Sequence, residues 1–230
     1  MPEIPGEAYY KNRIMPFNVS EKGRAEIEEV IRLLCDEGVT GRVLDVGCGP
    51  GLNVASLRQV DRNWTTIGVD YSPMGVRIAA REVGGIFLNL DAHNLAFQDG
   101  TFSAAIMTHA IGHVADPARV LSEMNRVLAP GGSAVVTTPN ARYVEVYRVF
   151  NERGLLPYKR DTTVMRYYDA DSLSDALAAV GFTVKSLACF GSLPSLEPGL
   201  LETGLLPPEI RLEDDGRRER LIALVRKEPR

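Results

Sequence analysis

The sequence predicts an α/β fold built on a doubly wound, mostly parallel β-sheet. Two observations lead to this prediction. Apolar runs of strand length alternate along the chain with amphipathic segments of helix length, which is the pattern of parallel strands joined by crossing helices. A glycine-rich turn at residues 47–51 joins one of these strands to a helix, and Asp70 ends the strand that follows. Ligands of such folds bind beyond the carboxyl ends of the strands, so a functional site is expected at that edge.

Five helices between the strands are expected from apolar periodicity and from capping residues. The first covers residues 20–37, with Ser20 as a candidate N-cap and Ile27, Val30 and Leu34 on one face. Two of the later helices begin at a proline, which suits the first helical position. These further helices are expected at residues 52–60, 73–83, 116–128 and 172–180.

Seven strands are expected from short apolar runs bounded by turn residues. The fifth follows a turn formed by Pro130, Gly131 and Gly132, and Pro139 ends it. Gly181 separates the last helix from the sixth strand. The expected strands cover residues 42–46, 66–70, 86–90, 103–108, 133–138, 182–190 and 220–227.

The composition indicates a soluble enzyme that does not bind nucleic acid. The chain has 230 residues and a net charge of −4, whereas nucleic acids and anionic membranes favour basic partners. The three cysteines are widely spaced and odd in number, so neither a disulfide framework nor a zinc site is predicted. Residues 1–18 are polar and interrupted by three prolines, and no apolar run is long enough to cross a bilayer. We therefore expect a cytoplasmic protein without a membrane span.

The glycine-rich turn predicts the cofactor. Gly47 and Gly49 would expose backbone to a ligand, and Asp70 is placed to accept hydrogen bonds from a ribose diol. The spacing is G-x-G-x-G rather than the dinucleotide G-x-G-x-x-G, and Asp45 precedes it. A carboxylate there repels a pyrophosphate but attracts an ammonium group. S-adenosylmethionine, which has an ammonium and a sulfonium and no phosphate, fits this pattern better than NAD.

With these motifs the chain resembles the class I S-adenosylmethionine-dependent methyltransferases, in particular the small-molecule group (methyltransferase type 11) that includes the ubiquinone-biosynthesis O-methyltransferases. The resemblance extends from about residue 12 to residue 184. It implies a Rossmann-like sheet of seven strands whose antiparallel last strand lies between the fifth and the sixth. The motifs are found at residues 45–51, 70–72, 90–92, 107–117 and 126–132.

Further cofactor contacts are expected at the ends of the strands. The resemblance places Asp91 at the adenine amino group and the Ala92 amide at an adenine ring nitrogen, although Asp91 as a helix N-cap is an open alternative. Tyr71 is expected to pack on the adenine. Thr108, after the fourth strand, should lie beside the methyl-bearing sulfur.

His109 is the candidate catalytic residue. It follows the fourth strand at the carboxyl edge, and an imidazole titrates close enough to neutral pH to remove a proton from a hydroxyl. In the quinone-type relatives a glutamate stands here, and a purely structural histidine is the alternative. His113, four residues on, is interpreted as structural. The spacing of the two histidines is one that metal ligands use, but the glutamate of H-E-x-x-H is missing, so no metal is predicted.

The whole chain, residues 1–230, is expected to form one domain with an N-terminal lid at residues 1–19. In that lid, either Arg13 or Asn18 would face the cofactor carboxylate. Two insertions, residues 141–168 and 191–218, would build the acceptor side. The first and its return to the sheet contain five tyrosines suited to a pocket wall with polar tips. These are Tyr143, Tyr147, Tyr158, Tyr167 and Tyr168.

The predicted function is O-methylation of a small-molecule metabolite with His109 as the base. N- or C-methylation of a natural product is the first alternative. The second is a catalytically silent, cofactor-binding partner protein, and the third an NAD-linked reductase. The acceptor is not identified by the sequence, and a homodimer is left open.

Overall fold

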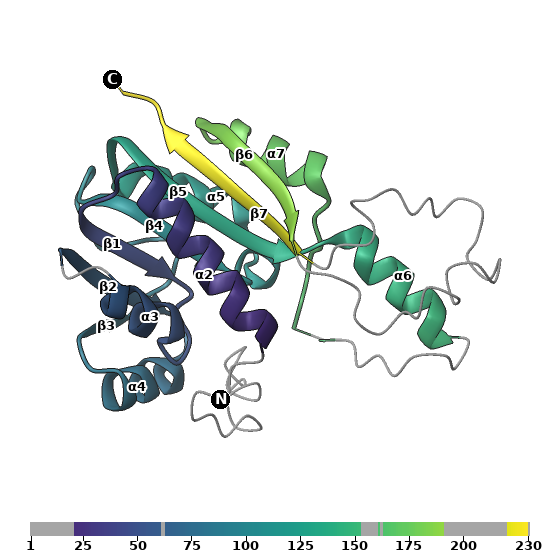
Figure 1. Cartoon of the computed structure of the whole chain (residues 1–230), viewed down its shortest axis with the longest axis horizontal. Helices are drawn as coiled ribbons and strands as arrows, with labels where there is room; N and C mark the ends of the chain where they lie inside the picture. The colour runs from purple at the N-terminus through teal and green to yellow at the C-terminus, as the bar shows by residue number, and fades with distance from the viewer. Residues whose placement is uncertain (1–20, 61–62, 153–160, 162, 191–219, 230) are drawn as a thin grey trace.

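The computed structural model describes residues 21–60, 63–152, 161, 163–190 and 220–229, and its described strands form one seven-stranded sheet (Figure 1). The strand order is β3-β2-β1-β4-β5-β7-β6. The strands are β1 (Gly41–Val46), β2 (Trp64–Asp70), β3 (Ile86–Asn89), β4 (Phe102–Thr108), β5 (Leu128–Pro139), β6 (Phe182–Phe190) and β7 (Arg220–Lys227).

The pairing of the strands confirms the predicted topology. β1 pairs in parallel with β2 and β4, β2 with β3, and β4 with β5. β7 lies between β5 and β6 and is antiparallel to both. The order reverses at β1, so the crevice beyond the carboxyl ends of β1 and β4 is the switch point where doubly wound sheets bind ligands.

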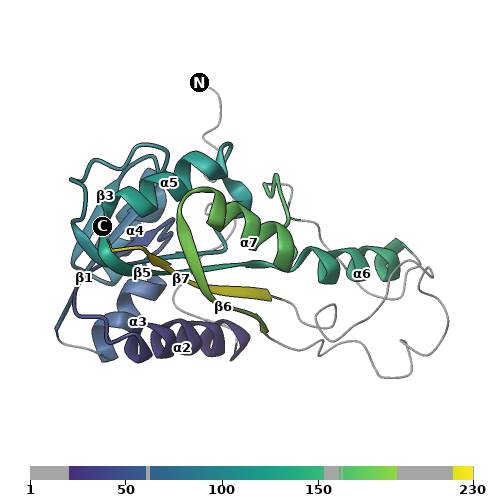
Figure 2. The ribbon, with the colours of Figure 1, turned by 90° about the horizontal axis from the view of Figure 1, so that it is seen from above.

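Helices cover both faces of this sheet (Figure 2). On one face lie α2 (Glu21–Asp36) and α3 (Leu52–Val60), and on the other α5 (Pro117–Val127) and α7 (Ala170–Ala179). The remaining helices are α4 (Pro73–Glu82), the short 3₁₀ helix η1 (Ile111–His113) and α6 (Ala141–Glu152), which extends beyond the end of β5 (Figure 1). None of the helices within the described ranges combines the length and the apolar character needed to cross a membrane.

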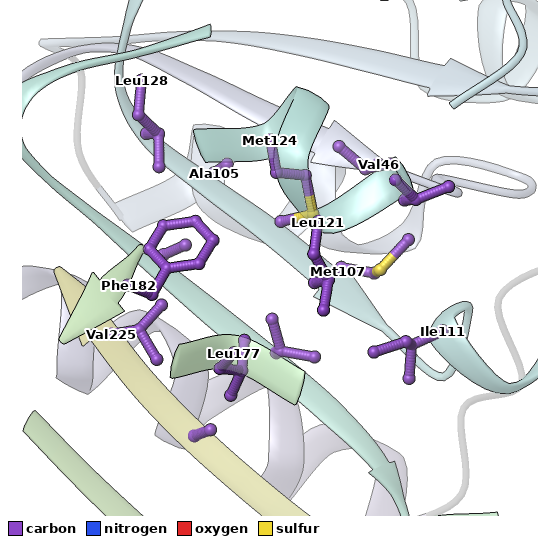
Figure 3. Close-up of a cluster of buried hydrophobic side chains, with 14 of the residues drawn as sticks. Val46, Ala105, Met107, Ile111, Leu121, Met124, Leu128, Leu177, Phe182 and Val225 are labelled. Atoms are coloured by element: carbon purple, nitrogen blue, oxygen red, sulfur yellow. The ribbon is translucent and has the colours of Figure 1, made fainter. Parts of the chain in front are cut away.

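The sheet separates two apolar cores. Figure 3 shows the larger one, in which Leu121 and Met124 of α5 and Leu177 of α7 gather over Ala105 and Met107 of β4. The second core lies under α2 and α3, on the opposite face of the same strands. Because successive residues of a strand point to opposite faces, neighbouring positions of β1 and β4 serve one core each. This double burial explains why apolar residues occupy successive positions in both strands, at residues 43–44 of β1 and 104–107 of β4.

The element boundaries differ from the predicted ones by a few residues. The largest difference is in β5, which begins at Leu128 rather than at residue 133. Leu128 pairs with Phe102, and the register then shifts before Ala104 pairs with Ser133. The predicted turn at residues 130–132 is thus an irregularity inside a longer strand. The helix expected from residue 172 begins at Ala170, because Asp169 caps it by accepting from the Ser172 amide.

Candidate functional site

The glycine-rich turn after β1 folds back onto β2. Gly47 has φ +75°, and a Cβ there would lie 2.6 Å from the Cβ of Ala110, so only glycine fits both the conformation and the space. The amides of Gly47 and Cys48 donate to the Val69 carbonyl at 2.8 and 2.9 Å. The Gly49 amide donates to Asp70 at 2.7 Å. The first three amides of the turn are therefore committed to β2 and do not form a cradle for a phosphate.

Asp45 lies under this turn and is only 1% exposed. Its Oδ1 accepts from the Asn53 amide at 3.3 Å, whereas Oδ2 is buried with no hydrogen-bond partner in the described residues. Burial raises the pKa of Asp45 to about 7, and the negative charge of Asp70 adds to this rise. The hydrogen bond from Asn53 acts in the opposite direction but is outweighed. A buried carboxyl oxygen without a partner is costly and is stabilised by a cation. The turn and Asp45 together fit an ammonium group rather than a pyrophosphate.

Asp70 ends β2 and braces the turn. Its Oδ2 accepts from Gly49, and its Oδ1 accepts from the Ser72 amide at 2.8 Å. Burial raises the pKa of Asp70, while these two bonds act in the opposite direction. A carboxylate offers about four acceptor positions, so two remain for a ribose diol. Tyr71, next in the chain, is 56% exposed.

Asp91 lies exposed in the turn after β3 and is tied to a residue that the sequence analysis did not consider. Its Oδ1 accepts from the backbone amide of His93 at 2.9 Å and from His93 Nδ1 at 2.6 Å. Partial burial opposes ionisation, but these bonds prevail and lower the pKa of Asp91. Asp91 caps a turn and not a helix, and Ala92 beside it packs on the larger core. Its second oxygen is left for a ligand.

Thr108 at the end of β4 is linked to Asp45 through Asn53. The Asn53 Nδ2 donates to Thr108 Oγ1 at 2.7 Å as well as to Asp45. Asn53 is buried on α3, and its single amide nitrogen thus joins the carboxyl ends of β1 and β4. Sequence reasoning missed this residue, although a polar side chain at a position that packs inward was a signal for it.

His109 has φ +53° and is the one non-glycine residue with positive φ in the described part of the chain. Histidine tolerates this region better than most residues, and such outliers gather at functional sites. Its amide donates to the Thr137 carbonyl at 3.0 Å, which fixes the backbone. The ring turns toward α2, where Nε2 lies 2.9 Å from the carboxylate of Glu26. Nδ1 has no partner in the described residues.

Glu26 and Arg220 complete this cluster and were not anticipated. Glu26 is 4% exposed and also forms an ion pair with Arg220 at the start of β7. Burial alone would raise the pKa of Glu26, but the bond with His109 and the charge of Arg220 outweigh it, and the pKa lies below its usual value. The sequence did contain a signal for Glu26: it lies four residues before Val30, so an acid is placed on the apolar face of the first helix.

His113 belongs to a different contact from His109. Its Nδ1 lies 3.0 Å from Thr163 Oγ1, which in turn donates to Asp161. The amide of Met165 donates to the Gly112 carbonyl at 2.9 Å, so this segment is fastened over η1. These contacts agree with a structural role for His113.

The predicted acceptor side is described only in part. Tyr143 and Tyr168 are buried, and Tyr168 belongs to the larger core, so these two pack inward. Of Tyr147 only the backbone is described. Outside the described residues lie Tyr158 and the insertion at residues 191–218. So do the lid at residues 1–19, with Arg13 and Asn18, and Ser20.

Comparison with known proteins identifies the family. Residues 20–187 match the methyltransferase domain family, and the chain belongs to it. It is 30% identical over 203 residues to demethylmenaquinone methyltransferase of Thermus thermophilus, covering 78% of this chain and 90% of that relative. It is 31% identical over 199 residues to the ubiquinone/menaquinone biosynthesis C-methyltransferase UbiE of Geobacter sulfurreducens, covering 75% of each.

A solved structure agrees in fold. The S-adenosylmethionine-dependent methyltransferase of Thermotoga maritima superposes with a TM-score of 0.64 at 24% identity, over 89% of this chain and 90% of that one. The predicted enzyme class and cofactor are thereby confirmed: the chain is an S-adenosylmethionine-dependent methyltransferase of small molecules.

Proposed function

We propose that the protein methylates a hydroxylated small molecule and that His109 removes the hydroxyl proton. The observation that carries the proposal is the placement of His109. Its ring stands at the carboxyl end of β4, next to Thr108, and is held at Nε2 by Glu26, while Nδ1 is left without a partner in the described residues. A base presented in this way at the switch point of the sheet suits proton removal from an acceptor.

The residues around the turn provide for the cofactor. Asp45, Gly47 and Gly49 would hold its ammonium end. An ammonium group needs acceptors, and the carboxyl oxygen of Asp45 that lacks a partner is one. The amides of the turn, which are donors, are already bonded to β2, so the turn would contribute its backbone oxygens. Asp70 would accept the ribose hydroxyls. The adenine would lie between Tyr71 and the pair Asp91 and Ala92, with Thr108 beside the sulfur. When bound, S-adenosylmethionine supplies an electrophilic methyl group.

The chain contributes the base and its orientation. The lone pair on His109 Nδ1 takes the proton of the acceptor hydroxyl, the O–H bond breaks, and its electron pair stays on the oxygen. The resulting imidazolium lies against the Glu26 carboxylate, which stabilises the positive charge. Transfer of the methyl group from the cofactor to that oxygen would give an ether and leave S-adenosylhomocysteine, which is the O-methylation outcome.

C-methylation is the second candidate, and the names of the relatives favour it. One relative is named for demethylmenaquinone and the other for ubiquinone and menaquinone C-methylation. A phenol or quinol that loses its proton gains electron density at the adjacent ring carbon as well as at the oxygen. The same histidine would therefore serve either outcome, and the pose of the acceptor would decide which atom is methylated.

The test uses S-adenosylmethionine carrying a 13C-labelled methyl group. The purified protein is incubated with a demethylmenaquinol-type naphthoquinol and with simple phenols, and the product is examined by NMR. The proposal predicts labelled methyl on oxygen or on the adjacent ring carbon, with release of S-adenosylhomocysteine only when acceptor is present. Transfer to nitrogen-containing acceptors but to none of the hydroxylated ones would overturn it. Cofactor binding without turnover on any acceptor would support the silent-partner alternative.

A further inference from the structure

Three side chains from distant parts of the chain meet behind the candidate base. Glu26 comes from α2, His109 follows β4, and Arg220 begins β7, so 83 and 194 residues separate Glu26 from its two partners. α2 crosses one face of the sheet, and Arg220 pairs with Pro139 at the carboxyl end of β5 (Figures 1 and 2). The contact therefore depends on the tertiary fold and cannot arise from local structure.

The electrostatics of the cluster fix where the proton lies. An ionised carboxylate as buried as Glu26 persists only with charged or hydrogen-bonded partners. Arg220 and His109 supply them, and the pKa of Glu26 is lowered, so the side chain is ionised at neutral pH. A carboxylate can only accept, so the hydrogen between it and the imidazole is carried by Nε2. The neutral ring then has its lone pair on Nδ1.

We propose that Glu26 is a positioning residue that sets the tautomer of His109, with Arg220 holding Glu26 in place, so that Nδ1 is the nitrogen that accepts the acceptor's proton. This rests on the proposed role of His109 as base. The backbone of His109 supports it, because φ +53° and the amide bond to Thr137 fix the Cα position from which the ring reaches Glu26. A plain structural tether between α2 and the sheet is the competing interpretation.

The experiment uses two substitutions of Glu26 and one control. Glu26→Gln keeps the size and one acceptor oxygen but removes the charge, and Glu26→Ala removes both. Glu29→Gln changes an acid on the same helix that pairs with Arg32 at the surface. For each protein we would record the imidazole 15N spectrum of His109, kcat, the KM for S-adenosylmethionine and the thermal midpoint. The wild-type spectrum needs no variant and stays informative if Glu26→Ala does not fold.

The proposal predicts that wild-type His109 carries its proton on Nε2 when neutral. Glu26→Gln should keep that tautomer, because its amide oxygen still accepts from Nε2. It should lower kcat by up to about 100-fold, because the imidazolium is no longer stabilised by a carboxylate, with KM for the cofactor unchanged. Glu26→Ala should give mixed tautomers and a further loss of kcat. Glu29→Gln should match wild type in every measurement.

Two results would overturn the proposal. One is a wild-type spectrum with the proton on Nδ1. The other is a lowered thermal midpoint in both Glu26 variants with unchanged kcat and tautomer, which would identify a tether. The proposed function fails separately: if His109→Ala left kcat unchanged, the base assignment would be wrong whatever the spectrum showed. If His109→Ala is slow and the Glu26 variants are not, only the positioning role is lost.

Discussion

The Nε2 atom of His109, just after β4, lies 2.9 Å from the carboxylate of Glu26 on α2, although 83 residues separate the two in the sequence. Arg220 binds the same carboxylate from the start of β7. The acid is thereby kept charged inside the protein, and the histidine lies at the edge of the sheet where Asp70 and Thr108 end their strands and Asp45 is the last residue but one of its strand. The candidate base and the candidate cofactor residues thus lie at one edge of the sheet.

Asp45→Asn should make the ligand-free protein more stable at pH 8 and leave its stability unchanged near pH 4. The pKa of Asp45 is raised to about 7 in the folded state, against 3.8 as a model value, so burying its charge costs stability increasingly as pH rises between these values. Asparagine keeps the shape and avoids the charge. The gain should reach up to about 4 kcal/mol above pH 7, at ~1.4 kcal/mol per pKa unit. Denaturant melts of both proteins at several pH values measure it, and a difference independent of pH would contradict it.

Cofactor binding should release a proton near pH 6. The ammonium of S-adenosylmethionine favours ionised Asp45, which is largely protonated at that pH in the free protein. Affinity should therefore rise with pH up to about pH 7 and level off above it. Calorimetric titrations with S-adenosylmethionine in two buffers of different ionisation enthalpy count the protons. The Asp45→Asn protein is the control and should release none from this site; equal release from both proteins would place the proton elsewhere.

Asn53→Ala should weaken cofactor binding and destabilise the protein by about 1–3 kcal/mol, because it leaves Thr108 and both Asp45 oxygens without partners. Thr108→Val is the matched control, since it removes the hydroxyl bond and leaves the bond to Asp45. Its effect on affinity should be smaller. Thermal melts and titration with S-adenosylhomocysteine compare the two, and equal losses would show that Asn53 does not act through Asp45.

Gly47→Ala should destabilise the turn for two separable reasons. The added methyl meets Ala110 at 2.6 Å, and alanine at φ +75° is strained by about 1–2 kcal/mol. Adding Ala110→Gly should remove the steric part and leave the conformational part. Free energies of unfolding for the two single variants and the double variant complete a cycle. Strict additivity would mean that the two side chains do not meet.

The fold was predictable because its signals are local. Alternating apolar runs, Pro73 at the start of a helix and the glycines of the turn each report on neighbouring residues, and they predicted the strands, five of the helices and the cofactor class. Helix α6 was not among the expected helices. The start of β5 was missed because the pairing of Leu128 with Phe102, which extends the strand past two glycines, is a tertiary contact.

The sequence could point to candidate site residues only near the carboxyl end of a strand. Asp45, Asp70, Thr108 and His109 were predicted from that position. Glu26, Asn53 and Arg220 contact residues that lie 8 to 194 positions away in the sequence. Their own sequence segments do not indicate which residues these are. His93 was overlooked because its bonds to Asp91 depend on the geometry of a turn.

The most direct test is a paired measurement on His109→Ala with the hydroxylated acceptor that the wild type uses. Calorimetry gives its affinity for S-adenosylmethionine, and single-turnover kinetics give the rate of methyl transfer. The proposed role predicts an affinity within about twofold of wild type and a rate lower by about 100-fold or more, the contribution expected of a general base. A rate equal to wild type, or a loss of rate matched by an equal loss of affinity, would contradict the assignment of His109 as the base.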